Sequence, residues 1–184
     1  MNALHYLVSA SFLACFLSFI WGMQRFFRVD GDMPAGARLI QLAGAASLIA
    51  QLAATRSAQI TVAAGVLATL LYTLSLVLFW CAIKANWRRP LTAAFSDDAP
   101  RHIVLRGPYR LVRHPVYSSY LLAWMAGVVA TREPWLLVTV VAMGVIYYVA
   151  ARKEERKFMS GPLAADYAAY RSRTGMFVPM GQAQ

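Results

Sequence analysis

Four residues near the middle of the chain, Arg113, His114, Pro115 and Tyr117, could form a ligand-binding site. Proline is favoured at the first position of a helix and keeps the residue before it out of helical geometry, so Pro115 predicts a helix start with His114 as its cap. The unpaired N–H groups of such a start bind carboxylates or phosphates. Arg113 adds a positive charge, and Gly107-Pro108 provides a turn that a ligand can approach closely. Judged by their position alone, these residues fit a role as anchors at a membrane interface at least as well as a role in ligand binding.

A second group of candidate residues lies at 152–157, where Glu154 and Glu155 stand among four basic residues. Each glutamate comes seven residues, nearly two helical turns, after a tyrosine. The two carboxylates therefore lie in line with different tyrosines, on different sides of one helix. We therefore expect only one of them to face any given site. A solvated collar of paired charges is the alternative, which spacing alone favours.

A short amphipathic helix is predicted beyond the break at Ser160-Gly161-Pro162, beginning at Pro162 and carrying Tyr167 and Tyr170 on one face. Arg171 and Arg173 follow it. The helix is too short to cross a membrane. It could anchor the chain at the membrane surface or fold back over the site as a lid.

The composition indicates the elements that must position these residues. Hydrophobic residues make up 59% of the 184 residues and charged ones 14%, and the mean hydropathy is +0.49. Soluble domains have about 25% charged residues, so the sequence excludes a cytosolic enzyme and a disordered chain. The two cysteines, Cys15 and Cys81, lie inside apolar runs, and we expect neither a disulfide scaffold nor a cysteine-based metal site.

The apolar runs predict an all-α, polytopic membrane helix bundle of about five transmembrane helices with a cytoplasmic helical tail. A helix needs about 20 apolar residues to cross the hydrocarbon layer. The second run is short and contains Gln41 and Gln51, so whether it crosses fully stays open. The chain is expected to form one domain, with apolar spans in 1–83 and the chemistry in 84–184. The five runs are 4–22, 39–55, 60–83, 115–131 and 134–151.

The distribution of charge predicts the orientation. With five spans, every basic residue among the 18 except Arg56 and Arg132 falls on the same side of the membrane. By the positive-inside rule that side is the cytoplasm, and the N-terminus lies outside. The net charge of +10 is then a topology signal that also suits anionic lipid headgroups, and no nucleic-acid partner is expected.

Taken together, these segments resemble the isoprenylcysteine carboxyl methyltransferase and phospholipid methyltransferase superfamily. The resemblance covers about residues 101–179, and the N-terminal half adds apolar character only. It rests on four pieces in order: Gly107-x-Tyr109, Arg113-His114-Pro115-x-Tyr117, Glu154-Glu155, and Tyr167-x-x-Tyr170-x-x-Arg173 followed by Phe177-Val178-Pro179. Two positions depart from the family pattern, because Ser119 and Ala164 stand where glycine is frequent.

The resemblance implies an integral-membrane enzyme that uses S-adenosylmethionine and releases S-adenosylhomocysteine, with the cofactor in a cytoplasmic pocket formed by the last spans and the tail. It also implies roles for single residues. His114 and Tyr117 should contact the cofactor, and Arg113 and Pro115 should shape its site. Gly107 and Tyr109 should form the rim of the pocket. One of Glu154 and Glu155 should hold a cofactor hydroxyl or amine, and Arg173 should face the substrate. Arg173 and Glu155 are the candidate catalytic residues.

The substrate is expected to be lipidic, and the small, Ala- and Arg-rich chain suggests a bacterial inner membrane. We rank carboxyl O-methylation first, amine N-methylation second and thiol S-methylation third. An ionised carboxylate needs no base, whereas an ammonium must first lose a proton to Glu154, Glu155 or His114. A non-catalytic membrane scaffold is the alternative of another class. The oligomeric state and the choice between the glutamates stay open.

Overall fold

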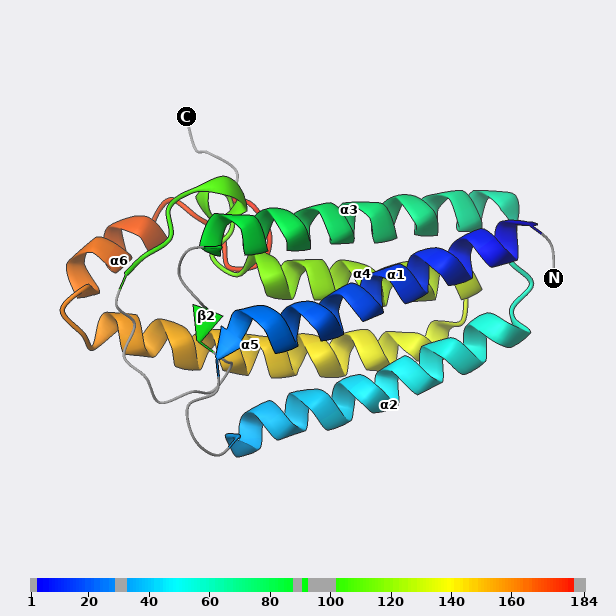
Figure 1. Cartoon of the computed structure of the whole chain (residues 1–184), viewed down its shortest axis with the longest axis horizontal. Helices are drawn as coiled ribbons and strands as arrows, with labels where there is room; N and C mark the ends of the chain where they lie inside the picture. The colour runs from blue at the N-terminus through cyan, green and yellow to red at the C-terminus, as the bar shows by residue number, and fades with distance from the viewer. Residues whose placement is uncertain (1–2, 29–32, 88–90, 93–101, 181–184) are drawn as a thin grey trace.

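The computed structural model describes residues 3–28, 33–87, 91–92 and 102–180, and six α-helices dominate them (Figure 1). Two 3-10 turns, η1 and η2, precede α4 and α5. The two-residue strands β1 and β2 pair in parallel, with Phe27 beside Leu91. The elements are α1 (Ala3–Phe26), β1 (Phe27–Arg28), α2 (Ala35–Ser57), α3 (Val62–Asn86), β2 (Leu91–Thr92), η1 (Gly107–Arg110), α4 (Pro115–Thr131), η2 (Pro134–Leu136), α5 (Leu137–Met159) and α6 (Ala164–Arg171).

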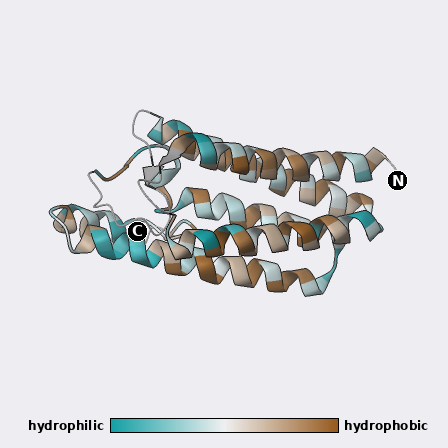
Figure 2. Ribbon diagram, turned by 60° about the horizontal axis from the view of Figure 1, so that its bottom comes forward, coloured by the Kyte–Doolittle hydropathy of each residue, from teal (hydrophilic) through white to brown (hydrophobic). Residues whose placement is uncertain are grey.

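The helices form the all-α membrane bundle that the apolar runs predict. Four segments are long and apolar enough to cross a membrane: α1, α2, α3 and Pro134–Met159, which contains η2 and α5. With its 17 residues, α4 is at the lower limit of a spanning length. The count of five spans therefore stays a prediction at α4. Figure 2 shows hydrophilic residues gathered at the end of the bundle that carries the C-terminus.

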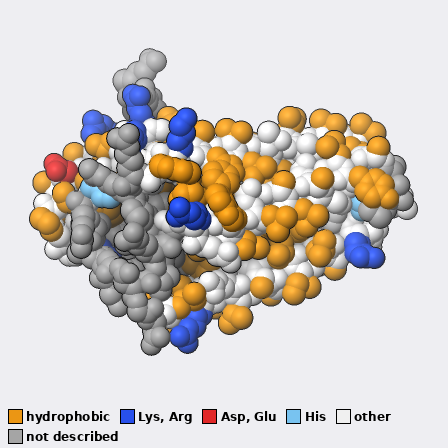
Figure 3. Space-filling view, viewed as in Figure 1, with side chains coloured by type: hydrophobic (Ala, Val, Ile, Leu, Met, Phe, Trp, Pro, Cys, Tyr) orange, Lys and Arg blue, Asp and Glu red, His pale blue; other side chains and the backbone are white. Residues whose placement is uncertain are grey.

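The core is aromatic and lies between α1, α3 and α4, with α4 packed most extensively against α3. Phe16 contacts Trp124 with ring centroids 4.6 Å apart, and Phe19 lies 4.6 Å from Tyr120. Hydrophobic side chains are spread over the face of the bundle seen in Figure 3, and many of the large exposed ones are leucines and valines, as expected for a surface that faces lipid.

The second helix docks through a polar side chain. α2 packs against α5 and α4 (Figure 1), and Gln51 on it is fully buried. Its Nε2 donates to the backbone oxygen of Trp124 at 2.8 Å, and Gly127 leaves the space that the glutamine occupies. A side-chain bond between helices is a common means of association inside a membrane. The glutamine that makes this run less apolar thus fixes α2 to the bundle, and its 23 residues suffice to cross.

Two of the predicted connections differ slightly in position. The hairpin expected at Arg56-Ser57 lies just beyond it, at 58–61, because α2 continues to Ser57 and Thr61 caps α3. The turn at Arg132-Glu133 is confirmed, with Arg132 in the left-handed region at φ 58°. The helix expected from Pro162 begins at Ala164.

Candidate active site

The site begins in the loop that enters α4. His114 is the N-cap of that helix, Pro115 is its first residue and Tyr117 lies in its first turn, as predicted. The turn at Gly107 is also confirmed: its φ is +58°, a conformation that favours glycine, and its backbone packs against Ala85 of α3. The loop thus places His114 at the end of the bundle where the C-terminal part of α5 lies.

The His114 ring lies between both glutamates. Its Nδ1 is 3.5 Å from Glu154 Oε2, and its Nε2 is 3.4 Å from Glu155 Oε1. The expectation that only one glutamate faces a given site is therefore wrong. Two adjacent stripes of α5 can meet one ring because an imidazole presents nitrogen atoms on two sides. His114 joins the start of α4 to the charged end of α5.

Tyr117 reinforces the same junction with both parts of its side chain. Its hydroxyl donates to Glu154 Oε1 at 2.6 Å. Its ring stacks on Tyr147 of α5, with centroids 5.2 Å apart and planes 10° apart, and lies 5.7 Å from the His114 ring. The packing of the Tyr117 ring therefore fixes the direction of its hydroxyl. The hydrogen bond from that hydroxyl engages Oε1 of Glu154 and leaves Oε2 on the other side of the carboxylate.

Arg113 is buried and makes its bonds within the protein. Only 7% of its side chain is exposed, and its Nε donates to Glu155 Oε1 at 2.7 Å. Its Nη1 donates to the backbone oxygens of Arg171, at 3.3 Å, and Thr174. A buried charge is tolerated when it is paired and hydrogen-bonded in this way. The arginine thus links the loop, α5 and the segment that follows α6.

The chain after α6 closes over the loop through its backbone. Arg113 N donates to Gly175 O at 2.8 Å, and His114 N donates to Met176 O at 3.1 Å. Ser118 Oγ donates to Phe177 O at 2.7 Å. Sequence reasoning found Phe177 in a motif but missed Thr174 and Gly175. Their one signal is a small residue at 175: a Cβ there would overlap the Val178 carbonyl oxygen.

The short helix α6 folds back over the loop, which favours the site-forming interpretation over a surface anchor. The Tyr170 hydroxyl donates to Tyr109 O at 2.6 Å, and the Tyr167 ring stacks on Phe158 of α5 at 4.5 Å. Burial raises the pKa of Tyr170 to about 12, so this hydroxyl keeps its proton and remains a donor at neutral pH. Tyr109, expected at the pocket rim, is buried beneath this contact.

The structure does not bring Arg173 into the cluster. Its side chain is exposed, and its Nε donates to the backbone oxygen of Ala169 at 3.1 Å. A role toward the substrate stays a prediction. The other sequence-predicted residues, Gly107, Tyr109, Arg113, His114, Pro115, Tyr117, Glu154 and Glu155, all lie in the loop, at the start of α4 or at the end of α5.

Two buried polar atoms in the cluster have no hydrogen-bond partner within the described part of the chain. They are His114 Nε2 and Glu155 Oε2, on side chains that are 10% and 4% exposed. Burying a polar atom without a partner destabilises a protein, and native structures keep few such atoms. A polar ligand held between these neighbouring side chains would give both atoms a hydrogen-bond partner.

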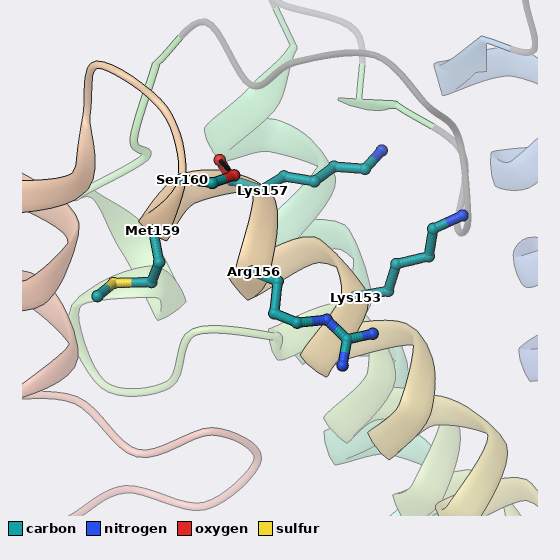
Figure 4. Close-up of a pocket in the computed structure, with 5 residues that line it drawn as sticks. All are labelled: Lys153, Arg156, Lys157, Met159 and Ser160. Atoms are coloured by element: carbon teal, nitrogen blue, oxygen red, sulfur yellow. Dashed lines mark hydrogen bonds between the residues drawn. The ribbon is translucent and has the colours of Figure 1, made fainter.

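A basic hollow lies beside the cluster, along another side of α5 and the residue that follows it (Figure 4). It is lined by Lys153, Arg156, Lys157, Met159 and Ser160. None of these residues belongs to the His114 cluster. Basic side chains just beyond a membrane-spanning segment are typical of contact with anionic headgroups.

Comparison with known proteins identifies the family. One curated relative, the cobalt-zinc-cadmium resistance protein CzcN of Cupriavidus metallidurans, is 31% identical over 101 residues, which are 54% of this chain and 41% of that protein. The chain thus spans less than half the length of this relative. The family model for phospholipid methyltransferases matches residues 60–164, from just before α3 to the start of α6 and through both glutamates. The match covers more than half of the chain, which therefore belongs to the phospholipid methyltransferase family.

Proposed function

We propose that this protein is an integral-membrane methyltransferase that takes its methyl group from S-adenosylmethionine and transfers it to a lipidic acceptor at the cytoplasmic face of a bacterial inner membrane. The observation that carries this proposal is the placement of His114 between Glu154 and Glu155, with Tyr117 bonded to Glu154. Polar residues converge here at one end of an otherwise apolar bundle. A non-catalytic scaffold gives no reason for this convergence.

The residues present fit the proposed cofactor. Glu155 Oε2 is a buried acceptor without a hydrogen-bond partner in the described residues, suited to an ammonium or a ribose hydroxyl. The N-terminus of α4 can attract a carboxylate through its positive dipole end. The Phe177 and His114 rings, 6.1 Å apart, offer flat surfaces for an adenine base. When bound, the cofactor supplies an electrophilic methyl group on a sulfonium.

The protein's contribution is orientation and the exclusion of water. Tyr117 and His114 hold Glu154 from two sides, and the backbone bonds of residues 175–177 close the loop against solvent. Holding two reactants in line can lower a barrier by about 7–11 kcal/mol in favourable intramolecular cases, so accurate placement accounts for a large part of the catalysis.

An amine acceptor fits this geometry best. An ammonium must lose a proton before its nitrogen can attack, and we assign Glu154 as the acceptor of that proton. The proton can then pass to water, because 32% of the Glu154 side chain is exposed, or to His114, whose Nδ1 lies 3.5 Å from Glu154 Oε2. Transfer to a carboxylate would not need a proton acceptor.

Carboxyl O-methylation, ranked first from the sequence, is the second candidate. The exposure of Arg173 favours it, because an exposed guanidinium can bind an incoming carboxylate through two parallel hydrogen bonds. Replacing Arg173 by alanine should then abolish most turnover of a carboxyl acceptor and leave turnover of an amine nearly unchanged. A thiol acceptor remains third.

The test uses membranes that contain the protein, methyl-labelled S-adenosylmethionine and a panel of lipid extracts. Mild alkali releases volatile methanol from a methyl ester but does not cleave an N-methyl group, whose label therefore stays non-volatile. We expect alkali-stable label that is lost in the His114→Ala variant and kept in the Arg110→Ala variant, which alters an exposed residue of the same loop. Volatile label would favour the carboxyl candidate. Wild-type protein that neither binds cofactor nor transfers label would favour the scaffold.

A further inference from the structure

Arg113 joins three segments that are far apart in the sequence. The arginine lies in the loop before α4, Glu155 lies near the end of α5, and Arg171 and Thr174 lie at and beyond the end of α6. Its own backbone N–H adds a bond to Gly175 O, and the next residue bonds Met176 O. We call residues 171–177 the C-terminal clasp. The Arg113 side chain therefore connects the loop to both α5 and the clasp.

The guanidinium of Arg113 is already hydrogen-bonded within the protein and is poorly placed to bind a ligand directly. Its side chain is 7% exposed, and both Nε and Nη1 donate to protein oxygens. A planar guanidinium can serve a carboxylate and two carbonyls at the same time, which the single ammonium of lysine cannot do with the same geometry. The arginine is therefore suited to fixing the positions of other groups.

Two groups of the site are positioned in this way. Arg113 binds Glu155 through Oε1 and leaves Oε2, the oxygen without a hydrogen-bond partner in the described chain, for a ligand. It also holds the clasp at Thr174, three residues before Phe177, whose ring lies 6.1 Å from His114. One side chain therefore sets both the acceptor carboxylate and the aromatic surface of the proposed cofactor site.

We propose that Arg113 is a positioning residue: it orients Glu155 and holds the C-terminal clasp closed across the start of α4, and so sets the affinity for the cofactor. This inference rests on the proposed function. Phe177 is the clasp residue that packs against the apolar core, whose buried members lie in α1, α3, α4 and α5 and in the loop turn η1. Opening the clasp should therefore leave the bundle folded while the site loses its geometry.

The experiment compares wild type with Arg113→Lys, Arg113→Ala and the control Arg110→Ala, all in lipid nanodiscs. Two quantities are measured: the dissociation constant of S-adenosylhomocysteine, and the hydrogen–deuterium exchange of residues 171–178 without ligand. Arg113→Ala should weaken binding by about 10- to 100-fold, the range expected for lost hydrogen bonds to a charged group. It should speed exchange in the clasp and leave exchange in α3 unchanged. Arg113→Lys should restore part of the binding and little of the clasp protection.

Steady-state kinetics provide a readout that a general loss of stability would not reproduce. For Arg113→Ala, KM for the cofactor should rise by a larger factor than kcat falls. Unchanged clasp exchange, or faster exchange with unchanged cofactor affinity, would overturn the positioning role. If wild type binds no cofactor, the proposed function fails, and with it the cofactor role of Arg113; clasp exchange would still report whether Arg113 holds the segment closed.

Discussion

At the scale of single residues, Tyr117 shows how ring packing and hydrogen bonding divide the work of one side chain. The ring stacks on Tyr147, and the hydroxyl donates to Glu154 at 2.6 Å. Phenylalanine keeps the ring and removes the hydroxyl. Because the ring contributes the packing, we expect loss of the hydroxyl to affect chemistry more than folding.

The Tyr117→Phe variant should therefore keep its thermal stability and lose activity by about 10- to 100-fold, as expected for one hydrogen bond to a charged group. Tyr148→Phe is the matched control, because Tyr148 lies on the same stretch of α5 as Tyr147 but is 49% exposed. Methyl-transfer rates and melting temperatures in detergent distinguish the two effects. Equal activity of the two variants would remove Tyr117 from the active site.

Gly175 is the position where the clasp tolerates least change. A Cβ there would overlap the Val178 carbonyl oxygen and lie 3.2 Å from Met180 N, so the backbone itself would have to move. We expect Gly175→Ala to displace the clasp and reduce cofactor binding by tenfold or more, about the effect of losing one or two backbone hydrogen bonds to the loop. In the control Gly144→Ala, the new Cβ would lie at an ordinary 3.6 Å from Leu121, and binding should be unchanged. Titration with S-adenosylhomocysteine measures both.

The sequence predicts residues of the site that depend on local rules. The cap position of His114 and the turn at Gly107 follow from proline and glycine chemistry. The meeting of both glutamates at one ring does not, because helical spacing gives the direction of each carboxylate along α5 but not the place of a ring on another segment. The bonds of Arg113 to Thr174 depend on a segment about 60 residues away and follow from no local pattern.

At the scale of secondary-structure elements, α2 is the least buried of the four candidate membrane spans. Most of its surface is exposed, and its bond from Gln51 to Trp124 O is the polar contact that holds it against α4. Trp124 also donates through Nε1 to the Tyr147 hydroxyl at 3.3 Å, so α2 is connected through Trp124 to the tyrosine on which Tyr117 stacks.

Gln51→Ala should lower the free energy of unfolding by about 1–2 kcal/mol, because an interhelical hydrogen bond in a membrane contributes about 0.6 kcal/mol on average and a cavity adds to its loss. Gln41→Ala is the control, since Gln41 lies exposed on the same helix. Thermal unfolding in micelles measures the difference between the two variants. Similar melting temperatures would mean that apolar packing alone docks α2.

The helices themselves could be predicted well, since long apolar runs have one stable form in a lipid environment. Their bounds are less certain where polar residues extend a helix beyond the apolar run. The apolar run of the first span predicts an end at Gly22, and α1 continues to Phe26. The apolar run of the fifth span ends at Ala151, and the helical continuation that carries both glutamates is confirmed, because α5 runs to Met159. Hydropathy alone misses this eight-residue extension, which forms the site.

At the scale of the whole molecule, the two ends of the bundle carry different elements. The described start of the chain, the 58–61 link and the turn at Arg132 lie at one end, and η1, α6 and the site lie at the other (Figure 1). Aromatic rings from α1 and from the end of α3 cluster at the end of the bundle that carries the site. The ring centroids of Phe26 and Trp87 are 4.9 Å apart, and those of Trp21 and Trp80 are 5.6 Å apart. Such rings typically lie at a membrane–water interface.

The orientation in the membrane is a prediction from charge that the fold makes testable. Ser57 and Ser172 are exposed and lie at opposite ends of the bundle, so each can be replaced by cysteine as a reporter. The native thiol at Cys81 is exposed, so both reporters are made in a Cys81→Ala background, in which buried Cys15 is retained.

In spheroplasts, a membrane-impermeant maleimide should label Ser57→Cys at once and Ser172→Cys only after permeabilisation, because 16 of the 18 basic residues fall on the side of the site and are retained in the cytoplasm. The opposite pattern would place the site outside, where S-adenosylmethionine is not supplied, and would contradict the proposed methyl donor. Labelling of both from outside would mean that two, and not three, of the helices between the reporters (α3, α4 and α5) cross the membrane, and would reduce the number of spans. Only the predicted pattern places the His114 cluster, the basic end of α5 and a cytoplasmic cofactor on one side of the membrane.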